Sequence, residues 1–345
     1  MNFQNFRVLN KKIQYLKCCI FLCIGLQTLV AQKILLEKPK PLAKPTENVQ
    51  KLLYSPQGNY LAAIVLQNKV LLYDAEGQLV RQYSAATHTL WADIAFSPDE
   101  KLLALALTRK DSSFLQLYAL ESGELLQTVF LFPASLSVME WHTQGEVLMC
   151  ASERRQLQAW QWLDNTLKRA HQIDWDKSNL DEAWAISATA NGRLWAVAGI
   201  GGELLIYEWK KQDLHLRQSL DINLPVYGLA FHPTEPKLYA SMADKIKNYA
   251  YQKRNWTQAD SLPTLTPIAN QMRFLKHSYD LVAVQQAKII QYRTNENHIV
   301  LPTILWESPQ NAHILAHTPN PQQTRWAIAT ADGKLSLFFV KTFED

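Results

Sequence analysis

One pattern recurs seven times between Asn48 and Val340: an apolar run, a turn, an alternating run, a short break and a run centred on an aromatic residue. The seven central aromatics are Tyr73, Tyr118, Trp160, Tyr207, Tyr249, Tyr292 and Phe338. Successive members are 42 to 47 residues apart, and a four-stranded propeller blade takes about 40–45 residues. The repeat therefore predicts an all-β fold, a seven-bladed β-propeller with four-stranded antiparallel blades.

The turn after the first strand of each unit keeps the same period. We place these turns at Pro56, Pro98, Thr143, Ala190, Pro233, Lys276 and Pro319. A blade buries its faces only against neighbouring blades. We therefore expect one closed ring, although 345 residues would also accommodate two domains.

The first residues have the features of an export signal. Arg7, Lys11, Lys12 and Lys17 precede an apolar run from Cys18 to Ala31, and such a basic start, apolar stretch and small final residue are typical of a signal peptide. A spanning helix needs about 20 apolar residues, so a retained signal anchor is the less favoured alternative. We predict a signal peptide at 1–31, a propeller at 32–345, no membrane span in the mature chain, and a periplasmic or secreted location.

Removal of residues 1–31 changes the charge balance and the cysteine count. The mature chain would carry 31 basic residues against the 31 acidic ones. Nucleic-acid binders carry a basic surplus to neutralise phosphates, so this partner class is disfavoured. Cys150 would be the one cysteine left, and it cannot form an internal disulfide. We expect it to be a small buried apolar residue.

The seventh unit ends without an outer strand, because only Thr342 to Asp345 follow its third strand. Before the first unit lies an unassigned strand-like stretch, Lys33 to Glu37. We predict that residues 33–37 join the seventh blade as its fourth strand. This pairing would close the ring and cover an edge that otherwise invites aggregation.

The units resemble the WD40 repeat family over roughly residues 33 to 345. The resemblance is carried by the aromatic-Ser/His-Pro turns and by the small-residue second strands. The matching segments are Tyr54-Ser55-Pro56, Phe96-Ser97-Pro98, Phe231-His232-Pro233, Tyr73-Asp74 and Thr330-Ala331-Asp332-Gly333-Lys334. The Gly-His dipeptide is absent and six of the seven units lack the terminal Asp, so we expect apolar packing to hold the blades together. Lactonase-like and quinoprotein-like propellers stay open as relatives.

No catalytic, cofactor or metal constellation stands out. The nine histidines are scattered without ligand spacing. The glycines of AGIGGEL fit a turn between two strands, because no helix follows them. The acidic connection around Asp174, Asp176, Asp181 and Glu182 could recruit calcium, but without a ligand loop a solvated acidic loop is favoured. We predict no cofactor and no metal.

Partner binding is the remaining expectation, since WD40-like domains engage partners at the channel rim. The rim positions by alignment are Trp91, Trp184, Tyr227, Asn270 and His313, and Arg109, Lys110, Arg154 and Arg155 add a basic sector. Aromatic and arginine side chains are enriched in binding hot spots. The aromatics could instead wedge between blades, and the basic residues could form a solvated edge.

Three functions remain in competition. We favour an exported, non-catalytic propeller that binds a protein or peptide. The alternative is a lactonase- or quinoprotein-type enzyme with its site in the channel, where the inner strands offer Asp93, Glu140, Asn270 and Gln271 among mostly apolar residues. A weaker option is a module of a cell-envelope assembly that docks by its blade edges.

Overall fold

The computed structural model describes residues 34–36, 40–42, 48–66, 68–142, 147–175, 178–263, 269–275, 280–295, 298–299 and 302–342. Leu35–Lys341 forms one compact unit; Met1–Ile34 and Thr342–Asp345 are assigned to a second unit, most of which lies outside the described residues. No helix within the described ranges has the length and apolarity needed to cross a bilayer. The predicted signal peptide, 1–31, also lies outside these ranges.

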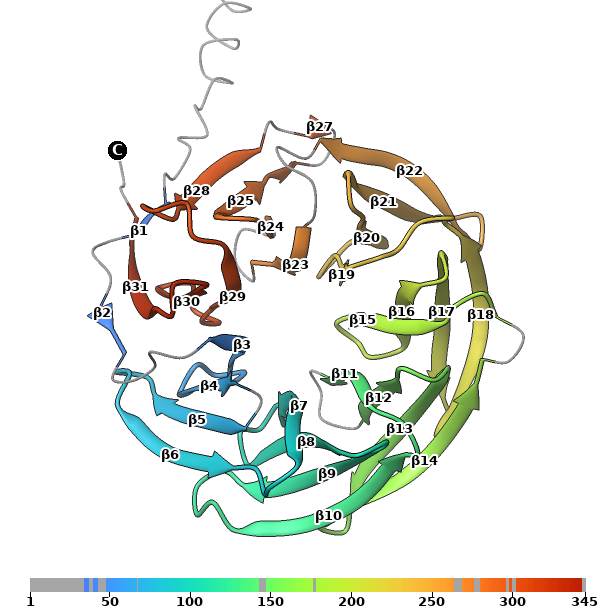
Figure 1. Ribbon diagram of the computed structural model, residues 1–345. Helices are drawn as coiled ribbons and strands as arrows, with labels where there is room; N and C mark the ends of the chain where they lie inside the picture. Colours follow the sequence, from blue (N-terminus) through green and yellow to red (C-terminus); the bar gives the residue numbers. More distant parts are fainter. Residues whose placement is uncertain are drawn as a thin grey trace, which may run out of the picture. The chain divides into compact units, whose positions relative to one another are not determined.

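Seven four-stranded antiparallel sheets surround a channel, so the predicted seven-bladed propeller is confirmed (Figure 1). Blade one contains β3 (Val49–Tyr54), β4 (Tyr60–Val65), β5 (Lys69–Asp74) and β6 (Leu79–Ser84). Blade two contains β7 (Thr89–Phe96), β8 (Leu102–Arg109), β9 (Ser112–Ala119) and β10 (Leu125–Phe132). Blade three contains β11 (Leu136–Trp141), β12 (Val147–Ser152), β13 (Gln156–Leu163) and β14 (Thr166–Asp174).

The remaining blades follow the same order from the channel outward. Blade four contains β15 (Glu182–Ala188), β16 (Leu194–Ile200), β17 (Glu203–Lys210) and β18 (Asp213–Asp221). Blade five contains β19 (Gly228–Phe231), β20 (Lys237–Ser241), β21 (Lys245–Gln252) and β22 (Asn255–Pro263). Blade six contains β23 (Ala269–Phe274), β24 (Leu281–Gln285), β25 (Lys288–Tyr292) and β28 (Thr303–Glu307), with a hairpin of β26 (Thr294–Asn295) and β27 (His298–Ile299) inserted before its last strand.

Blade seven joins the two ends of the propeller chain. It contains β29 (Ile314–Pro319), β30 (Arg325–Thr330) and β31 (Leu335–Thr342), and β1 (Ile34–Leu36) pairs with β31 as the fourth strand. This confirms the closure predicted from the sequence. A second short strand, β2 (Lys40–Pro41), also pairs with β31, opposite Leu337 and Ser336. The ring is therefore closed by two segments, of which the sequence indicated one.

The interior of the ring lies between neighbouring blades. Six hydrophobic clusters of buried side chains each draw on two adjacent blades. The repeated aromatics lie on the third strands; six of them are 0–6% exposed and Tyr118 is half-buried. Cys150 is buried and free, as expected. Burying apolar surface contributes about 25 cal/mol per Å², so these interfaces are the main stabilising feature of the ring.

One backbone hydrogen bond closes the first turn of every blade. The N–H of a residue at the end of the inner strand donates to the carbonyl five positions later, at 2.8–3.0 Å. These turn-closing residues are Ser55, Ser97, His142, Thr189, His232, Leu275 and Asn320. In blades one and two the serine Oγ also accepts the N–H that starts the second strand, both at 2.9 Å, which explains the Ser-Pro turn motif.

The turn-closing residues correct one sequence alignment. In six blades the turn residue predicted from the period directly follows the turn-closing residue. In blade seven the predicted turn residue, Pro319, is the last residue of β29 and pairs with Trp326. The turn instead begins at Asn320-Pro321, two residues later. The segment Pro319-Asn320-Pro321 contains two prolines that fit the turn motif. The hydrogen bond from the Asn320 N–H to the Arg325 carbonyl identifies Pro321 as the turn residue.

Candidate functional site

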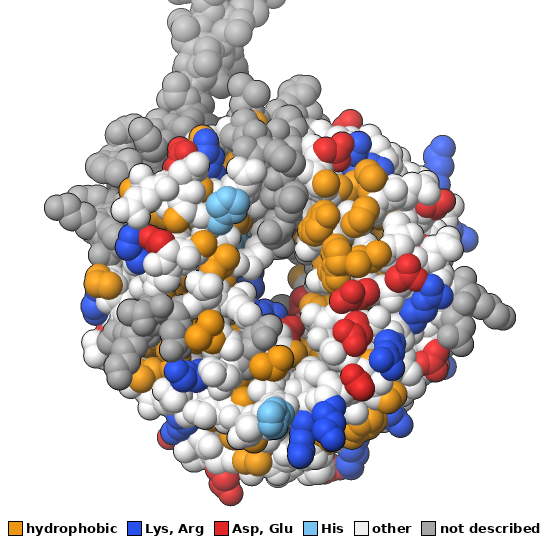
Figure 2. All heavy atoms as spheres, viewed as in Figure 1, with side chains coloured by type: hydrophobic (Ala, Val, Ile, Leu, Met, Phe, Trp, Pro, Cys, Tyr) orange, Lys and Arg blue, Asp and Glu red, His pale blue; other side chains and the backbone are white. Residues whose placement is uncertain are grey.

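One face of the ring carries the connections that lead from an outer strand to the next inner strand, together with the turns between second and third strands. We call it the top face; residues 85–88 and 222–227 belong to it. All eight residues predicted to bind a partner lie in elements that end at this face. Figure 2 shows hydrophobic side chains gathered over the β15 and β19 sector, with acidic side chains beside them.

Trp184 and Tyr227 form the aromatic centre of this sector. Their ring centroids are 5.4 Å apart and both side chains are half-buried. Leu224 is 36% exposed, and Pro225 next to it is also exposed. These four residues come from neighbouring blades and form the patch that we call the aromatic sector.

A β-bulge explains why Trp184 is accessible. The ladder between β15 and β16 pairs Ala183 with Gly199 and Ala185 with Ala198, so Trp184 is the extra residue of the bulge. Gly199 permits this close approach, since a Cβ there would lie 2.0 Å from the Glu182 carbonyl oxygen. Bulges redirect side chains at strand ends, and this one releases the indole from the blade interface.

Trp91 lies one position earlier in its blade than Trp184 does, counted back from the turn-closing residues Ser97 and Thr189. It pairs with Leu107 in the regular part of the ladder, and the bulge falls on the next residue, Ala92. A one-residue shift sends a side chain to the opposite face of a sheet. Trp91 is 3% exposed and packs in the cluster between blades one and two, which agrees with the wedge alternative for this residue.

The other predicted residues are not gathered at one point. Arg155 forms an ion pair with Asp181 next to the aromatic sector, whereas Arg154 and Arg109 are exposed on the turns of blades three and two. His313 is exposed just before β29. Asn270 belongs to β23, but its side chain lies outside the described residues. Of the predicted residues, the structure thus brings Trp184 and Tyr227 into contact, while Arg155 pairs with Asp181, three residues before Trp184 in the chain.

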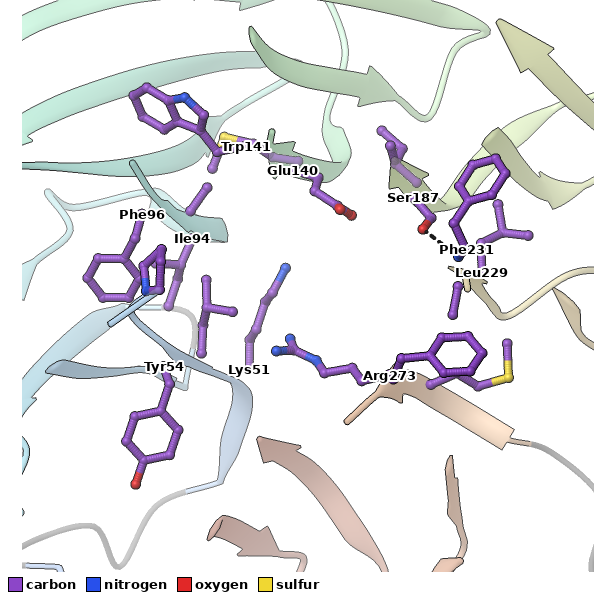
Figure 3. A pocket seen from close by; sticks show the side chains of 18 residues that line it. Lys51, Tyr54, Ile94, Phe96, Glu140, Trp141, Ser187, Leu229, Phe231 and Arg273 are labelled. Atoms are coloured by element: carbon purple, nitrogen blue, oxygen red, sulfur yellow. Dashed lines mark hydrogen bonds between the residues drawn. The ribbon is translucent and has the colours of Figure 1, made fainter. Parts of the chain in front are cut away.

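A second candidate site lies in the central channel. A cavity of about 480 Å³ is lined by the inner strands of blades one to six, a size within the range of small-molecule sites, about 300–1,000 Å³. Looking into the channel, Figure 2 shows both acidic and basic side chains. In Figure 3, Lys51, Glu140 and Arg273 extend into the cavity from different strands, among aromatic side chains.

Two charges occupy equivalent positions on opposite walls. The residues two places before the turn-closing residue are Leu53, Ala95, Glu140, Ser187, Ala230, Arg273 and Thr318. Only Glu140 and Arg273 are ionisable, and their blades, three and six, are as far apart as two blades of a seven-membered ring can be. No ion pair within 4.0 Å joins them. Arg273 donates to the Thr318 hydroxyl at 3.3 Å, while no hydrogen bond to the Glu140 carboxyl exists within the described part of the chain.

Asp93 and Lys51 have a different role. One Asp93 oxygen accepts the Ile94 N–H at 2.6 Å and the other accepts the Met139 N–H of the next blade at 2.7 Å. Lys51 forms an ion pair with the same carboxylate. Asp93 thus links blades one, two and three, and its charge is compensated within the ring.

Burial sets the protonation of the uncompensated groups. It raises the pKa of Glu140 to about 7; nearby Arg273 and Lys51 oppose the shift and Asp93 adds to it. Burial likewise lowers the pKa of Arg273, against the attraction of Glu140. It also lowers the pKa of His317 to about 3, with a contribution from Arg273. A perturbed carboxyl in a cavity is a recognised indicator of a functional site.

Sequence reasoning found the carboxylates of the channel and missed its cations. Asp93 and Glu140 were identified among the inner-strand acids, but Lys51 and Arg273 were not considered. The signal was available, because Lys51 aligns with Asp93 and Arg273 aligns with Glu140 when the units are superposed on their turns. The alignment could not show that Glu140 and Arg273 form no direct ion pair across the channel.

Comparison with models of known protein families finds no match, and comparison with curated protein sequences finds no significant match. Across the described ranges, no group of three or more His, Cys, Asp and Glu side chains is placed to hold a metal ion.

Proposed function

We propose that this protein is an exported, non-catalytic propeller of the WD40 type that binds a peptide segment of a partner protein at its top face. The observation that carries the proposal is the contact of Trp184 with Tyr227, two half-buried rings held across neighbouring blades on a rigid sheet framework. Large aromatic side chains held in place lose little entropy on binding and dominate hot spots.

The surroundings of the aromatic sector favour a partner with apolar and basic side chains. Leu224 and Pro225 extend the apolar surface. Asp221, the last residue of β18, is exposed directly before the connection 222–227, and Asp244, exposed on the turn before β21, forms an ion pair with Lys245. Complementary charges at a rim steer association and select among partners more than they add affinity.

The WD40 assignment is supported by the Ser-Pro turns and by the closing strand. The Thr330 hydroxyl donates to Asp332, and Lys334 contacts the same carboxylate at 2.6 Å, so the Thr-Ala-Asp-Gly-Lys segment forms an ordered turn. Export is supported by the composition of residues 1–31 alone.

A selection from a phage-displayed peptide library tests the proposal. Peptides enriched on the wild-type protein should bind Trp184→Ala and Tyr227→Ala at least tenfold more weakly, because a hot-spot side chain contributes about 2 kcal/mol or more. Leu216→Ala is the matched control, since Leu216 is 55% exposed on the outer strand β18. Enriched peptides that bind both aromatic variants as well as the wild type would exclude this site.

The channel enzyme remains the second candidate, and the raised pKa of Glu140 is the observation in its favour. A carboxyl with a pKa near 7 can exchange a proton at neutral pH.

A further inference from the structure

The channel contains a pair of charges that the fold does not use. Asp93 and Lys51 compensate each other and link three blades. Glu140 and Arg273 share one level of the channel on opposite walls and form no ion pair with each other. An uncompensated charge in a partly dry site raises the free energy of the folded protein, so this pair costs stability in the empty ring.

The two charges define what could bind between them. Arg273 presents a planar guanidinium, which pairs with carboxylates in a two-point geometry. Among the described residues, its guanidinium donates one hydrogen bond, at 3.3 Å to the neutral Thr318 hydroxyl. Glu140 offers an acceptor to a cationic donor. A ligand that carries both a carboxylate and an ammonium group would therefore satisfy both walls.

The other residues that line the cavity indicate which uncharged group the ligand has. At the level of Glu140 and Arg273 the cavity wall is formed by Leu53, Ala95, Ser187 and Ala230, whereas Phe96 and Phe231 are 4% and 7% exposed and pack between blades. Small apolar side chains on a cavity wall favour an apolar group in the ligand. The cavity thus combines two opposed charges with a largely apolar wall.

We propose that the channel binds a small zwitterion with an apolar side chain, an amino acid or the like, with its carboxylate on Arg273 and its ammonium group on Glu140. This site is separate from the aromatic sector of the top face and does not depend on the proposed peptide binding. Binding would offset the desolvation cost of the two charges and so stabilise the ring.

Isothermal titration calorimetry at pH 7 with three related probes tests the proposal. L-phenylalanine carries both charges, 3-phenylpropanoate lacks the ammonium group, and 2-phenylethylamine lacks the carboxylate. We expect one L-phenylalanine to bind per ring, with a Kd at least tenfold lower than that of either analogue. The proposal would be overturned if L-phenylalanine did not bind at millimolar concentration, or if an analogue bound equally well. This test uses only the wild-type protein.

Two substitutions then assign the contacts. Arg273→Gln and Glu140→Gln should each raise the Kd of L-phenylalanine at least tenfold, and Glu140→Gln should also abolish the preference over 3-phenylpropanoate. Glu121→Gln, at an exposed residue, is the control and should leave the Kd unchanged. Unchanged affinity in both channel variants would show that the ligand lies elsewhere. Trp184→Ala should bind L-phenylalanine normally, which separates this test from that of the peptide site.

Discussion

The interfaces between blades and the wall of the channel are built from the same inner strands, yet they follow different rules. At the interfaces the repeat is kept, and apolar side chains of one blade meet those of the next in six clusters. In the channel the repeat is broken at single positions by Glu140 and Arg273. The comparison teaches that periodic apolar residues hold the ring together, whereas departures from the period place charges in the channel, where we propose that a ligand binds.

The largest effect is expected at an interface. Trp195 is fully buried between blades three and four, and its indole N–H donates to the Gly192 carbonyl at 3.1 Å. Trp195→Ala should lower the free energy of unfolding by about 3–5 kcal/mol, because it removes apolar contacts and leaves a cavity. Urea denaturation measures the change. A loss below about 1 kcal/mol would mean that the interfaces are not the main stabilising feature.

The ring closure comes next. Deletion of residues 32–38 removes β1, the fourth strand of blade seven. A few ladder hydrogen bonds at about 1 kcal/mol net each predict a loss of about 2–3 kcal/mol and a lower Tm. The strand β2 stays in the deleted protein, so blade seven should remain partly covered. An unchanged melting curve would show that closure does not contribute to stability.

A substitution in the channel should increase stability, whereas the two preceding changes decrease it. Glu140 has its folded pKa raised to about 7, so the folded state holds a proton that the unfolded state releases at lower pH. Stability is therefore lost as the pH rises from about 4.5 to 7. Arg273, Lys51 and Asp93 are the charged groups that act on it. Glu140→Gln should equal the wild type near pH 4 and exceed it by about 1–3 kcal/mol at pH 8. Urea denaturation at both pH values checks this, and a difference independent of pH would contradict it.

The smallest effect is expected on the top face. The Arg155–Asp181 ion pair is about half exposed on both sides, and such pairs contribute about 0–1 kcal/mol. Arg155→Gln should change the free energy of unfolding by less than about 1 kcal/mol, and less still at high salt. A loss comparable to that of Trp195→Ala would place this pair among the interface contacts instead of the surface ones.

Regular positions were predictable and irregular ones were not. The period places the aromatics on the third strands, and six of the seven predicted turns lie directly after the turn-closing residues. Both blades carry a bulge at the same aligned position, which Trp184 occupies in blade four and Ala92 in blade two, so Trp91, one position earlier, stays buried. The second closing strand, β2, and the hairpin β26–β27 have no repeat signal, because each occurs once.

The sequence by itself determined the number of blades, their strand order and the strand that closes them, since a period and its apolar faces are local properties of the chain. The tertiary structure alone decided that Glu140 and Arg273 face each other without a bond, and that Trp184 meets Tyr227. These relations depend on the width of the channel and on how neighbouring blades meet, which arise only when seven blades are packed against one another around an axis.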